Sequence, residues 1–295
     1  MVIIMELYYL WLILLFKPAN PILQTVIEHY GDAETAYREI SGGDHSCLDE
    51  DRKSALSGIS LERAEEIAAF CTQNGYGILC IEDERYPALL KEIYNPPLVL
   101  FYRGTPECLN NRLCITAVGS RAVTPYIERL CAKVCADLSS RGIVLASGMA
   151  HGVDSAVHYA CVRQKAPTVG VLACGINYDY PRGSEELREQ IVLNGGAYLT
   201  ELLPGTSPSP DYFRARNRIL AGLSRGTAVF QAGVTSGALI TASYAADEGR
   251  DVFCVPPPDI FDPRYSGVVK FLREGAIPLF NHDDILNEYT AYLES

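Results

Sequence analysis

Four arginines and no acidic residue lie in the segment 212–225 of a chain whose formal net charge is −11. These arginines are Arg214, Arg216, Arg218 and Arg225, and Phe213 comes directly before the first of them. Guanidinium groups bind phosphates and an aromatic ring stacks on an unpaired base, so the combination is suited to gripping single-stranded nucleic acid. Because a short arginine run is also typical of a solvated helix face, the rest of the chain must distinguish these two interpretations.

Three turns that contain glycine and serine follow apolar, strand-like runs and could bind phosphate groups. Their candidate residues are Gly119, Ser120 and Arg121 in the first turn, Ser147 and Gly148 in the second, and Ser236 and Gly237 in the third. Backbone N–H groups at the start of a helix bind anions directly. Glycine and serine also serve in ordinary turns and caps. The three turns taken together with the arginine segment favour a phosphate-lined groove.

The spacing of the reactive residues does not indicate catalysis. The first turn is not a Gly-x-Gly-x-x-Gly fingerprint, and no Gly-Lys-Ser/Thr phosphate loop occurs in the chain. His151 and Asp154 lie on one turn, with His158 one helical turn further on, but this pattern is more typical of turn and cap residues. We therefore expect a protein that is not an enzyme, with no catalytic residue, no metal site and no cofactor.

Ten cysteines raise the question of disulfides or a metal site. The chain has no Cys-x-x-Cys pair, and most of its cysteines lie inside apolar runs, where a free thiol packs as a small hydrophobic group. This usage predicts a reducing, cytoplasmic compartment. The apolar start, residues 2–16, contains Glu6 and is too short to span a bilayer, so we expect a buried helix and no membrane partner.

The elements that must position these residues can be read from the pattern of apolar residues. The first 74 residues have helical spacing and predict a small helical domain. Residues 75–288 alternate strand-like and helical stretches, which predicts an α/β fold with a doubly wound, mainly parallel sheet. The expected strands are 78–81, 98–102, 114–118, 143–146, 168–173, 197–200, 227–230 and 252–255, and the expected helices are 126–139, 153–163, 185–193, 216–223 and 238–248. Ligands of such sheets bind beyond the carboxyl ends of the strands, where all three turns lie.

In this order, the motifs resemble those of the DNA-processing protein A family (DprA, also called Smf). The resemblance runs to about Leu286 and includes Tyr86-Pro87, the three turns, Tyr180-Pro181, the segment 201–206, Phe213 with 216–224, and the segments 236–242, 249–253 and 275–276. It implies an extended Rossmann-like domain behind a small helical domain. Residues 289–295 would be a short tail without the C-terminal winged helix of some members.

The resemblance also implies a function. Family members bind single-stranded DNA, load a RecA-type recombinase during natural transformation, and form homodimers without a cofactor. By position, the residues that would contact DNA are Ser120, Arg121, Phe213, Arg216, Asn217 and Arg218, and those that would line the same groove are Gly119, Ser147, Gly148, Ser236 and Gly237. Arg214, which departs from the family pattern, could either loosen the loop or add a phosphate contact as a further DNA-binding candidate.

Several residues depart from the family pattern. Arg214 stands where proline is usual, Gln231 replaces a glutamate, and Pro257 replaces a glycine. Further departures are Asn177, Ser184 and Val269. These changes bear on loop shapes and partner contacts more than on the groove.

A different class of function remains open. The same sheet architecture occurs in phosphoribohydrolases of the lysine-decarboxylase-like group, whose Pro-Gly-Gly-x-Gly-Thr loop is followed by glutamates. Here the corresponding loop is 235–238 and the nearest preceding position is Gln231, so general acid–base catalysis lacks a carrier. The alternative is thus an enzyme on, or a sensor of, a nucleotide or nucleoside phosphate.

Overall fold

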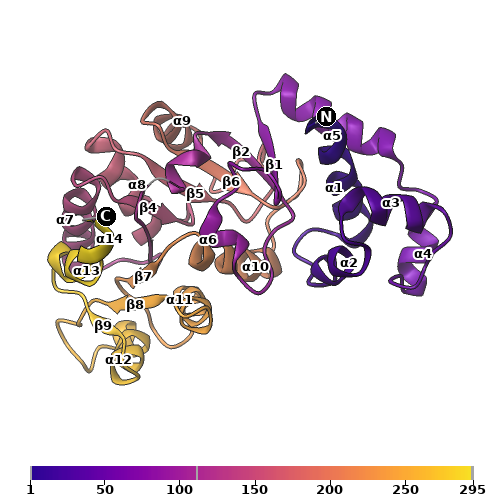
Figure 1. Ribbon diagram of the computed structural model, residues 1–295. Coiled ribbons are helices and arrows are strands. Elements are labelled where there is room, and N and C mark those ends of the chain that lie inside the picture. The colour runs from indigo at the N-terminus through magenta and orange to yellow at the C-terminus, as the bar shows by residue number, and fades with distance from the viewer. Residues whose placement is uncertain (1, 111, 294–295) are drawn as a thin grey trace.

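The computed structural model describes residues 2–110 and 112–293. Its first part is a cluster of five helices: α1 Val2–Phe16, α2 Ile22–Tyr30, α3 Ala33–Ser41, α4 Glu50–Leu56 and α5 Leu61–Gln73. Asp32, Asp49 and Ser60 cap three of them by accepting hydrogen bonds from backbone N–H groups in the first turn. Helix α1 is buried from Tyr9 onward because α3 and α5 pack against it (Figure 1), which explains its continuous apolar sequence.

The rest of the molecule is built around one nine-stranded sheet, whose strand order is β1-β2-β6-β5-β4-β3-β7-β8-β9. The strands are β1 Gly77–Cys80, β2 Val99–Gly104, β3 Cys114–Val118, β4 Val144–Ser147, β5 Thr168–Val171, β6 Ala197–Thr200, β7 Gly226–Val229, β8 Asp251–Cys254 and β9 Ile277–Pro278. The seven strands β3 to β9 run parallel to their neighbours in the order β6-β5-β4-β3-β7-β8-β9. Strand β2 is antiparallel to both β1 and β6. The carboxyl ends of the parallel strands therefore meet at one edge.

Helices cover both faces of the sheet, since alternate strand residues point to opposite sides. Helices α7 Pro125–Ser140, α8 Val153–Arg163 and α13 His282–Glu288 pack on one face. The short α6 Ala88–Lys91, with α10 Pro210–Gly222, α11 Gly237–Asp247 and α12 Ser266–Arg273, packs on the other. Helix α9 Glu185–Leu193 lies beside α8, and α14 Thr290–Leu293 follows α13. Two 3₁₀ turns, Pro106–Leu109 and Pro263–Tyr265, complete the elements.

The structure confirms the expected Rossmann-like, doubly wound and mainly parallel sheet with a helical N-terminal region. Most predicted bounds differ from the observed ones by one or two residues, the helices α6, α12, α13 and α14 were not predicted, and two further details differ. Helix α10 begins at Pro210 rather than at 216, because Ser209 caps it and proline is well placed in a first turn. Strand β9 has two residues, too few for a periodic signal, and was not predicted. The division at 74/75 stays a prediction and falls in the turn between α5 and β1.

Within the described residues, no helix is long and apolar enough to cross a membrane. The ten cysteines carry free thiols, and seven of them are fully buried. Cys131 and Cys135 face each other along α7 with their Sγ atoms 3.9 Å apart. Burial raises the pKa of Cys161 and Cys254 to about 12, so these thiols remain protonated and packed.

Candidate nucleic-acid interface

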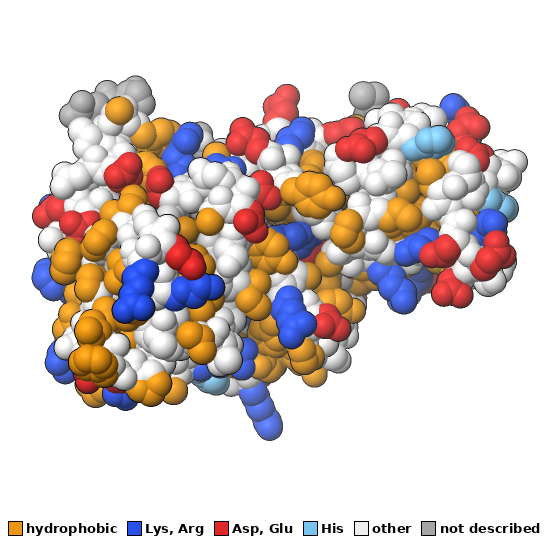
Figure 2. Space-filling model, turned by 90° about the horizontal axis from the view of Figure 1, so that it is seen from below, with side chains coloured by type: hydrophobic (Ala, Val, Ile, Leu, Met, Phe, Trp, Pro, Cys, Tyr) orange, Lys and Arg blue, Asp and Glu red, His pale blue; other side chains and the backbone are white. Residues whose placement is uncertain are grey.

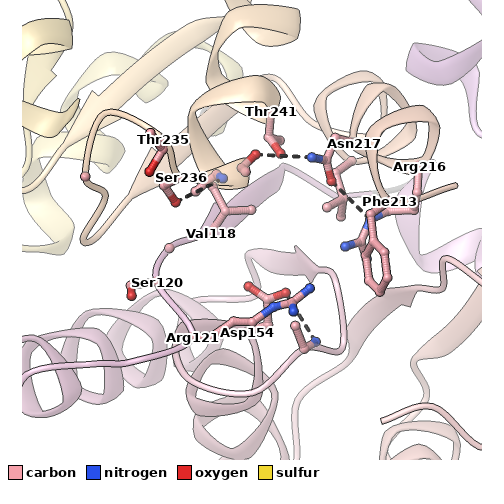
Figure 3. Close-up of a pocket in the computed structure, with 16 residues that line it drawn as sticks. Val118, Ser120, Arg121, Asp154, Phe213, Arg216, Asn217, Thr235, Ser236 and Thr241 are labelled. Atoms are coloured by element: carbon pink, nitrogen blue, oxygen red, sulfur yellow. Dashed lines mark hydrogen bonds between the residues drawn. The ribbon is translucent and has the colours of Figure 1, made fainter. Parts of the chain in front are cut away.

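A pocket of about 400 Å³ opens at the carboxyl ends of β3, β4 and β7, which are neighbours in the sheet. The residues that matter for its chemistry are Arg121, Asp154, Phe213, Arg216, Asn217 and Ser236. Figure 3 shows Arg121 and Asp154 on one side of this pocket and Asn217, Ser236 and Thr241 on the other. The fold thus brings together turns that are more than a hundred residues apart in the sequence.

The first turn needs glycine for steric reasons. A Cβ atom on Gly119 would lie 2.5 Å from Cγ2 of Val153, at the start of α8. The N–H of Ser120 donates to the Gln231 carbonyl at 2.8 Å, which ties this turn to the end of β7. The Gln231 side chain accepts from the Thr124 N–H at 3.0 Å and donates to the Ala122 carbonyl at 3.0 Å. A glutamate there could not make the second bond, so the amide fits this loop.

Phe213, Arg216 and Asn217 reach the pocket from one face of α10. Their spacing of three and four residues places them side by side on a helix. Arg121 approaches from the facing turn, and its guanidinium carbon lies 5.1 Å from the centre of the Phe213 ring. The guanidinium of Arg216 lies 5.9 Å from the same centre. An aromatic face bordered by two cations is suited to a base and its phosphates.

Arg216 is a buried cation held in place by its neighbours. It donates to the carbonyl of Gly148 at 2.6 Å, to the carbonyl of Val171, and from Nε to Oδ1 of Asn217 at 3.2 Å. Gly148 must be small, because a Cβ would lie 2.6 Å from Cζ of Arg216. Burial lowers the pKa of Arg216 from its usual value, and the opposing effect of Asp154 offsets this in part. The guanidinium therefore provides a fixed positive charge at the pocket wall.

The third turn ends at the start of α11, and Thr235, Ser236, Gly237 and Ala238 line the pocket there. Ser236 caps this helix by accepting from the N–H of Ala238 at 3.3 Å. The side chain of Asn217 donates to the carbonyl of Gly237 at 3.2 Å and fixes the turn against α10. A Cβ on Gly237 would meet nothing within 4 Å, so this glycine leaves open space. Such a helix start favours an anion.

Asp154 is the one acidic residue among those that line this pocket. Its buried carboxylate accepts from the N–H of Ala150 at 3.3 Å. Burial raises the pKa of Asp154, while Arg216 opposes the rise. His158 is fully buried on α8 and pairs through Nδ1 with Oγ1 of Thr168 at 2.9 Å. His151 is exposed and is not part of the pocket wall.

The structure does not bring all the predicted residues together. Arg218 faces away from the pocket and pairs with Glu201 at 2.5 and 2.6 Å, while its Nε donates to the Asn95 carbonyl at 2.9 Å. Arg225 lies over the Tyr292 ring at 4.5 Å, beyond α10 at the opposite edge of the sheet. Arg214 is exposed next to the pocket rather than in it. Arg216 is thus the one member of the arginine segment in the pocket wall.

Ser147 and Gly148 support the pocket from beneath. The Ser147 hydroxyl is buried and donates to the Ala117 carbonyl at 2.7 Å, which joins β4 to β3. Gly148 contributes its carbonyl to Arg216. The wall itself includes the residues Gly119, Ser120, Arg121, Phe213, Arg216, Asn217, Ser236 and Gly237, all of them predicted from the sequence.

Sequence reasoning missed other residues of the site. Thr235 and Thr241 add hydroxyls to the wall, and Asp154 was interpreted as a cap rather than as a pocket residue. Tyr180 packs edge-on against Phe213, with ring centres 5.6 Å apart, and the exposed Arg182 follows it. The position of 180–182 directly after the β5 loop was the available signal, because that loop also opens at the carboxyl edge.

Comparison with known proteins adds independent information. The family described as DNA recombination-mediator protein A matches residues 77–290. The DNA processing protein DprA of Bacillus subtilis is 36% identical over 222 residues, which cover 75% of this chain and 74% of that protein. The Streptococcus pneumoniae DprA is 38% identical over 209 residues, covering 71% and 73% respectively.

Two solved structures share the architecture. The X-ray structure of Streptococcus pneumoniae DprA aligns with a TM-score of 0.69 at 36% identity, over 77% of this chain and 80% of that one. A Helicobacter pylori DprA structure, described as giving insight into a single-stranded DNA binding mode, aligns with a TM-score of 0.65 at 25% identity. That alignment covers 74% of this chain and 96% of the other.

Proposed function

This chain belongs to the DNA recombination-mediator protein A family, and from that premise we propose that its pocket binds single-stranded DNA. The observation that carries the proposal is the Phe213 ring beside the guanidinium groups of Arg121 and Arg216 in one open pocket. Guanidinium groups and helix starts hold phosphates, and the ring stacks on a base. The Helicobacter relative, whose structure is described as showing a single-stranded DNA binding mode, supports this choice of ligand.

The charge distribution favours a local site over a coated surface. The chain carries −11 overall, so phosphate is repelled from most of the molecule. Figure 2 shows basic, acidic and hydrophobic side chains interspersed on the face seen from below, without one continuous basic surface. A strand would thus be gripped at the pocket, not wrapped around the protein.

The DNA contacts that we propose come from Ser120, Arg121, Phe213, Arg216, Asn217 and the Ser236-Gly237 turn, with Arg214 at the rim. Within the described residues, the Arg121 side chain forms no hydrogen bond or close ion pair; it lies over the Phe213 ring and acts on the Asp154 carboxylate only through its charge. It can turn toward a phosphate without breaking a polar contact. Ser147, Gly148 and Arg218 would act by holding the surrounding structure.

We extend the proposal to the step that follows DNA binding. The family is described as a recombination mediator, which supports delivery of the bound strand to a RecA-type recombinase in natural transformation. We also propose a homodimer and a cytoplasmic location, the latter because ten free thiols suit a reducing compartment. A cofactor has no part in this scheme.

The competing function is turnover of a nucleotide or nucleoside phosphate in the same pocket. Asp154 would have to serve alone there, because the pocket wall holds no second acid and no histidine. General acid–base catalysis usually needs a group within hydrogen-bond reach and a partner of different pKa. We therefore propose a binding protein and not an enzyme.

One pair of assays separates the two functions. Fluorescence anisotropy with a labelled oligo-dT measures strand binding, and chromatography after incubation with nucleoside monophosphates detects released base or sugar. We expect saturable binding of the oligonucleotide and unchanged nucleotides. Release of base or phosphate that is lost in Asp154→Asn, with the fold intact, would replace the binding proposal by the enzymatic one.

A further inference from the structure

Strand β1 lies at the edge of the sheet (Figure 1), and its outer side faces a groove that is separate from the proposed DNA-binding pocket around Phe213. In the sheet order it lies five places from β3, which leads into the pocket. Two adjoining cavities, of about 430 Å³ and about 690 Å³, follow this edge and share Glu6 and Arg85 in their walls. The larger is bounded by α1, α5 and the residues Gly77 and Ile78 of β1.

The register of β1 shows which backbone groups point into this groove. The N–H of Ile81 donates to the Leu98 carbonyl at 3.0 Å, and residues 77 and 79 follow the same alternation against β2. In an antiparallel pair the residues between them direct their N–H and C=O groups to the outer side. These are Ile78 and Cys80. The Cys80 carbonyl accepts from Asp83 at 2.9 Å, but the described chain provides no partner for the other three groups.

The groove has an apolar floor and an acidic border. Leu7, Ala68 and Ile78 contribute apolar surface, and the ring of Tyr102 lies over Gly77. Acidic side chains border the two cavities: Glu6, Glu65, Glu82, Asp83 and Glu84. Asp83 is neutralised by Arg85 at 2.7 Å, whereas the four glutamates have no ion-pair partner in the described structure. Burial raises the pKa of Glu6, but Glu65, Glu82 and Glu84 are exposed, so the charge of these three is available to a ligand.

We propose that this groove docks an extended segment of a partner protein, in which apolar residues alternate with lysine or arginine. The segment would pair with the outer side of β1 as an added strand, through Ile78 and the N–H of Cys80. Its apolar side chains would contact the floor and its cations the glutamates. Charge complementarity selects this occupant over nucleic acid, which the same glutamates repel. This inference is independent of the DNA pocket.

The probe for the test is a fluorescein-labelled ten-residue peptide of alternating lysine and valine, compared with the same peptide carrying glutamate for lysine. We expect saturable anisotropy for the lysine peptide only. Ile78→Pro removes the outward N–H without removing a bond to β2, so it should weaken binding roughly tenfold. The matched control Ile78→Val keeps that N–H and should bind as the unchanged protein does.

A charge variant tests the second feature of the groove. Glu82→Lys should weaken binding of the lysine peptide at least about fivefold, while oligo-dT binding stays the same. If Ile78→Pro fails to fold, hydrogen exchange of the unchanged protein replaces it, and the amides of Ile78 and Cys80 should exchange more slowly with peptide present.

Three results would overturn the proposal. The first is lack of saturable binding of the lysine peptide. The second is peptide binding that Ile78→Pro does not weaken and that does not slow the exchange of the Ile78 and Cys80 amides, because such binding would be electrostatic attraction alone. The third is concentration-dependent self-association of the unchanged protein that Ile78→Pro abolishes, because the occupant would then be a second copy of this chain.

Discussion

Arg121 and Arg216 bring the same charge to one pocket, but only Arg121 has a guanidinium that can turn toward a ligand. Arg216 donates to two carbonyls and to Asn217, so its position is fixed without any ligand. Arg121 rests on the Phe213 ring, 5.1 Å from its centre. Fixed charge lowers the cost of organising the site, whereas the mobile charge adapts to the path of the strand.

The Phe213 ring should contribute stacking without charge. We expect Phe213→Ala to weaken oligo-dT binding by about 1–3 kcal/mol, because one base loses its aromatic partner. The dependence of log Kd on log salt should stay the same, since stacking releases no counterion. Anisotropy titrations over a salt series measure both quantities. A changed slope with unchanged affinity would contradict the stacking role.

Replacing Arg121 should change the salt dependence of oligo-dT binding, which the Phe213 variant leaves unchanged. Arg121→Ala removes one phosphate contact and should reduce the salt slope for single strands by about 0.7, with the melting temperature unchanged. Arg141→Ala is the matched control, because Arg141 is an exposed arginine at the end of α7, before β4 and thus at the opposite edge of the sheet. Equal salt slopes for Arg121→Ala and Arg141→Ala would show that Arg121 is an ordinary surface residue without a phosphate contact.

Helix α10 links the proposed DNA-binding pocket to the rest of the sheet. One of its faces presents Phe213 and Arg216 to the ligand, and another places Arg218 against Glu201 at the end of β6. The same guanidinium holds the Asn95 carbonyl, in the segment that leads into β2. The helix is therefore anchored by an internal ion pair on the side that faces away from the pocket.

This ion pair leads to a stability prediction. Arg218→Ala leaves the buried Glu201 carboxylate unpaired and should lower the free energy of unfolding by about 3–5 kcal/mol. The double variant Arg218→Met with Glu201→Leu should recover much of that loss. Urea unfolding of Arg218→Met, of Glu201→Leu and of the double variant measures the coupling energy between the two side chains. Additive losses would show that Arg218 and Glu201 are not coupled. A stable Arg218→Ala protein with weakened DNA binding would show that Arg218 contacts the strand.

Helix α8 is fixed to β5 by His158, and this contact should be sensitive to pH. Burial, with Arg216 nearby, lowers the pKa of His158 from 6.5 to about 3. Below about pH 6.5, His158 is therefore protonated in the unfolded chain but stays neutral in the folded chain until the pH falls to about 3. Stability contributed by the neutral ring is lost as the pH falls through that range.

The pH dependence of the unfolding free energy tests this role of His158. Between about pH 6 and pH 4, the unfolding free energy of the unchanged protein should fall more steeply than that of His158→Asn, by up to about 1.4 kcal/mol per pH unit. Urea unfolding at several pH values in this range tests it. Parallel curves would mean that His158 is protonated in the folded state.

How far the sequence predicts the structure also depends on the element. Helices 153–163 and 185–193 were predicted to the residue, because apolar periodicity and end signals agree there. The pocket wall was predicted from Gly119–Arg121 and Ser236-Gly237, since turns after parallel strands meet at one edge. The ion pair between Arg218 and Glu201 was not predicted, because the two residues are 17 positions apart in the sequence and only tertiary packing brings them together. The role of Asp154 in the pocket escaped for the same reason.

For the whole molecule, the central claim is that an acidic protein grips single-stranded DNA at one small basic pocket. Phe213 can stack only on a base that is free of its duplex partner, so preference for single strands follows from the site. The most direct test is the anisotropy of a labelled single strand and of a duplex of the same length, titrated at matched salt over a series. We expect tighter binding of the single strand at every salt concentration, and Phe213→Ala should reduce the difference in affinity between the single strand and the duplex. Equal affinity for the two, with the same salt slope, would contradict it.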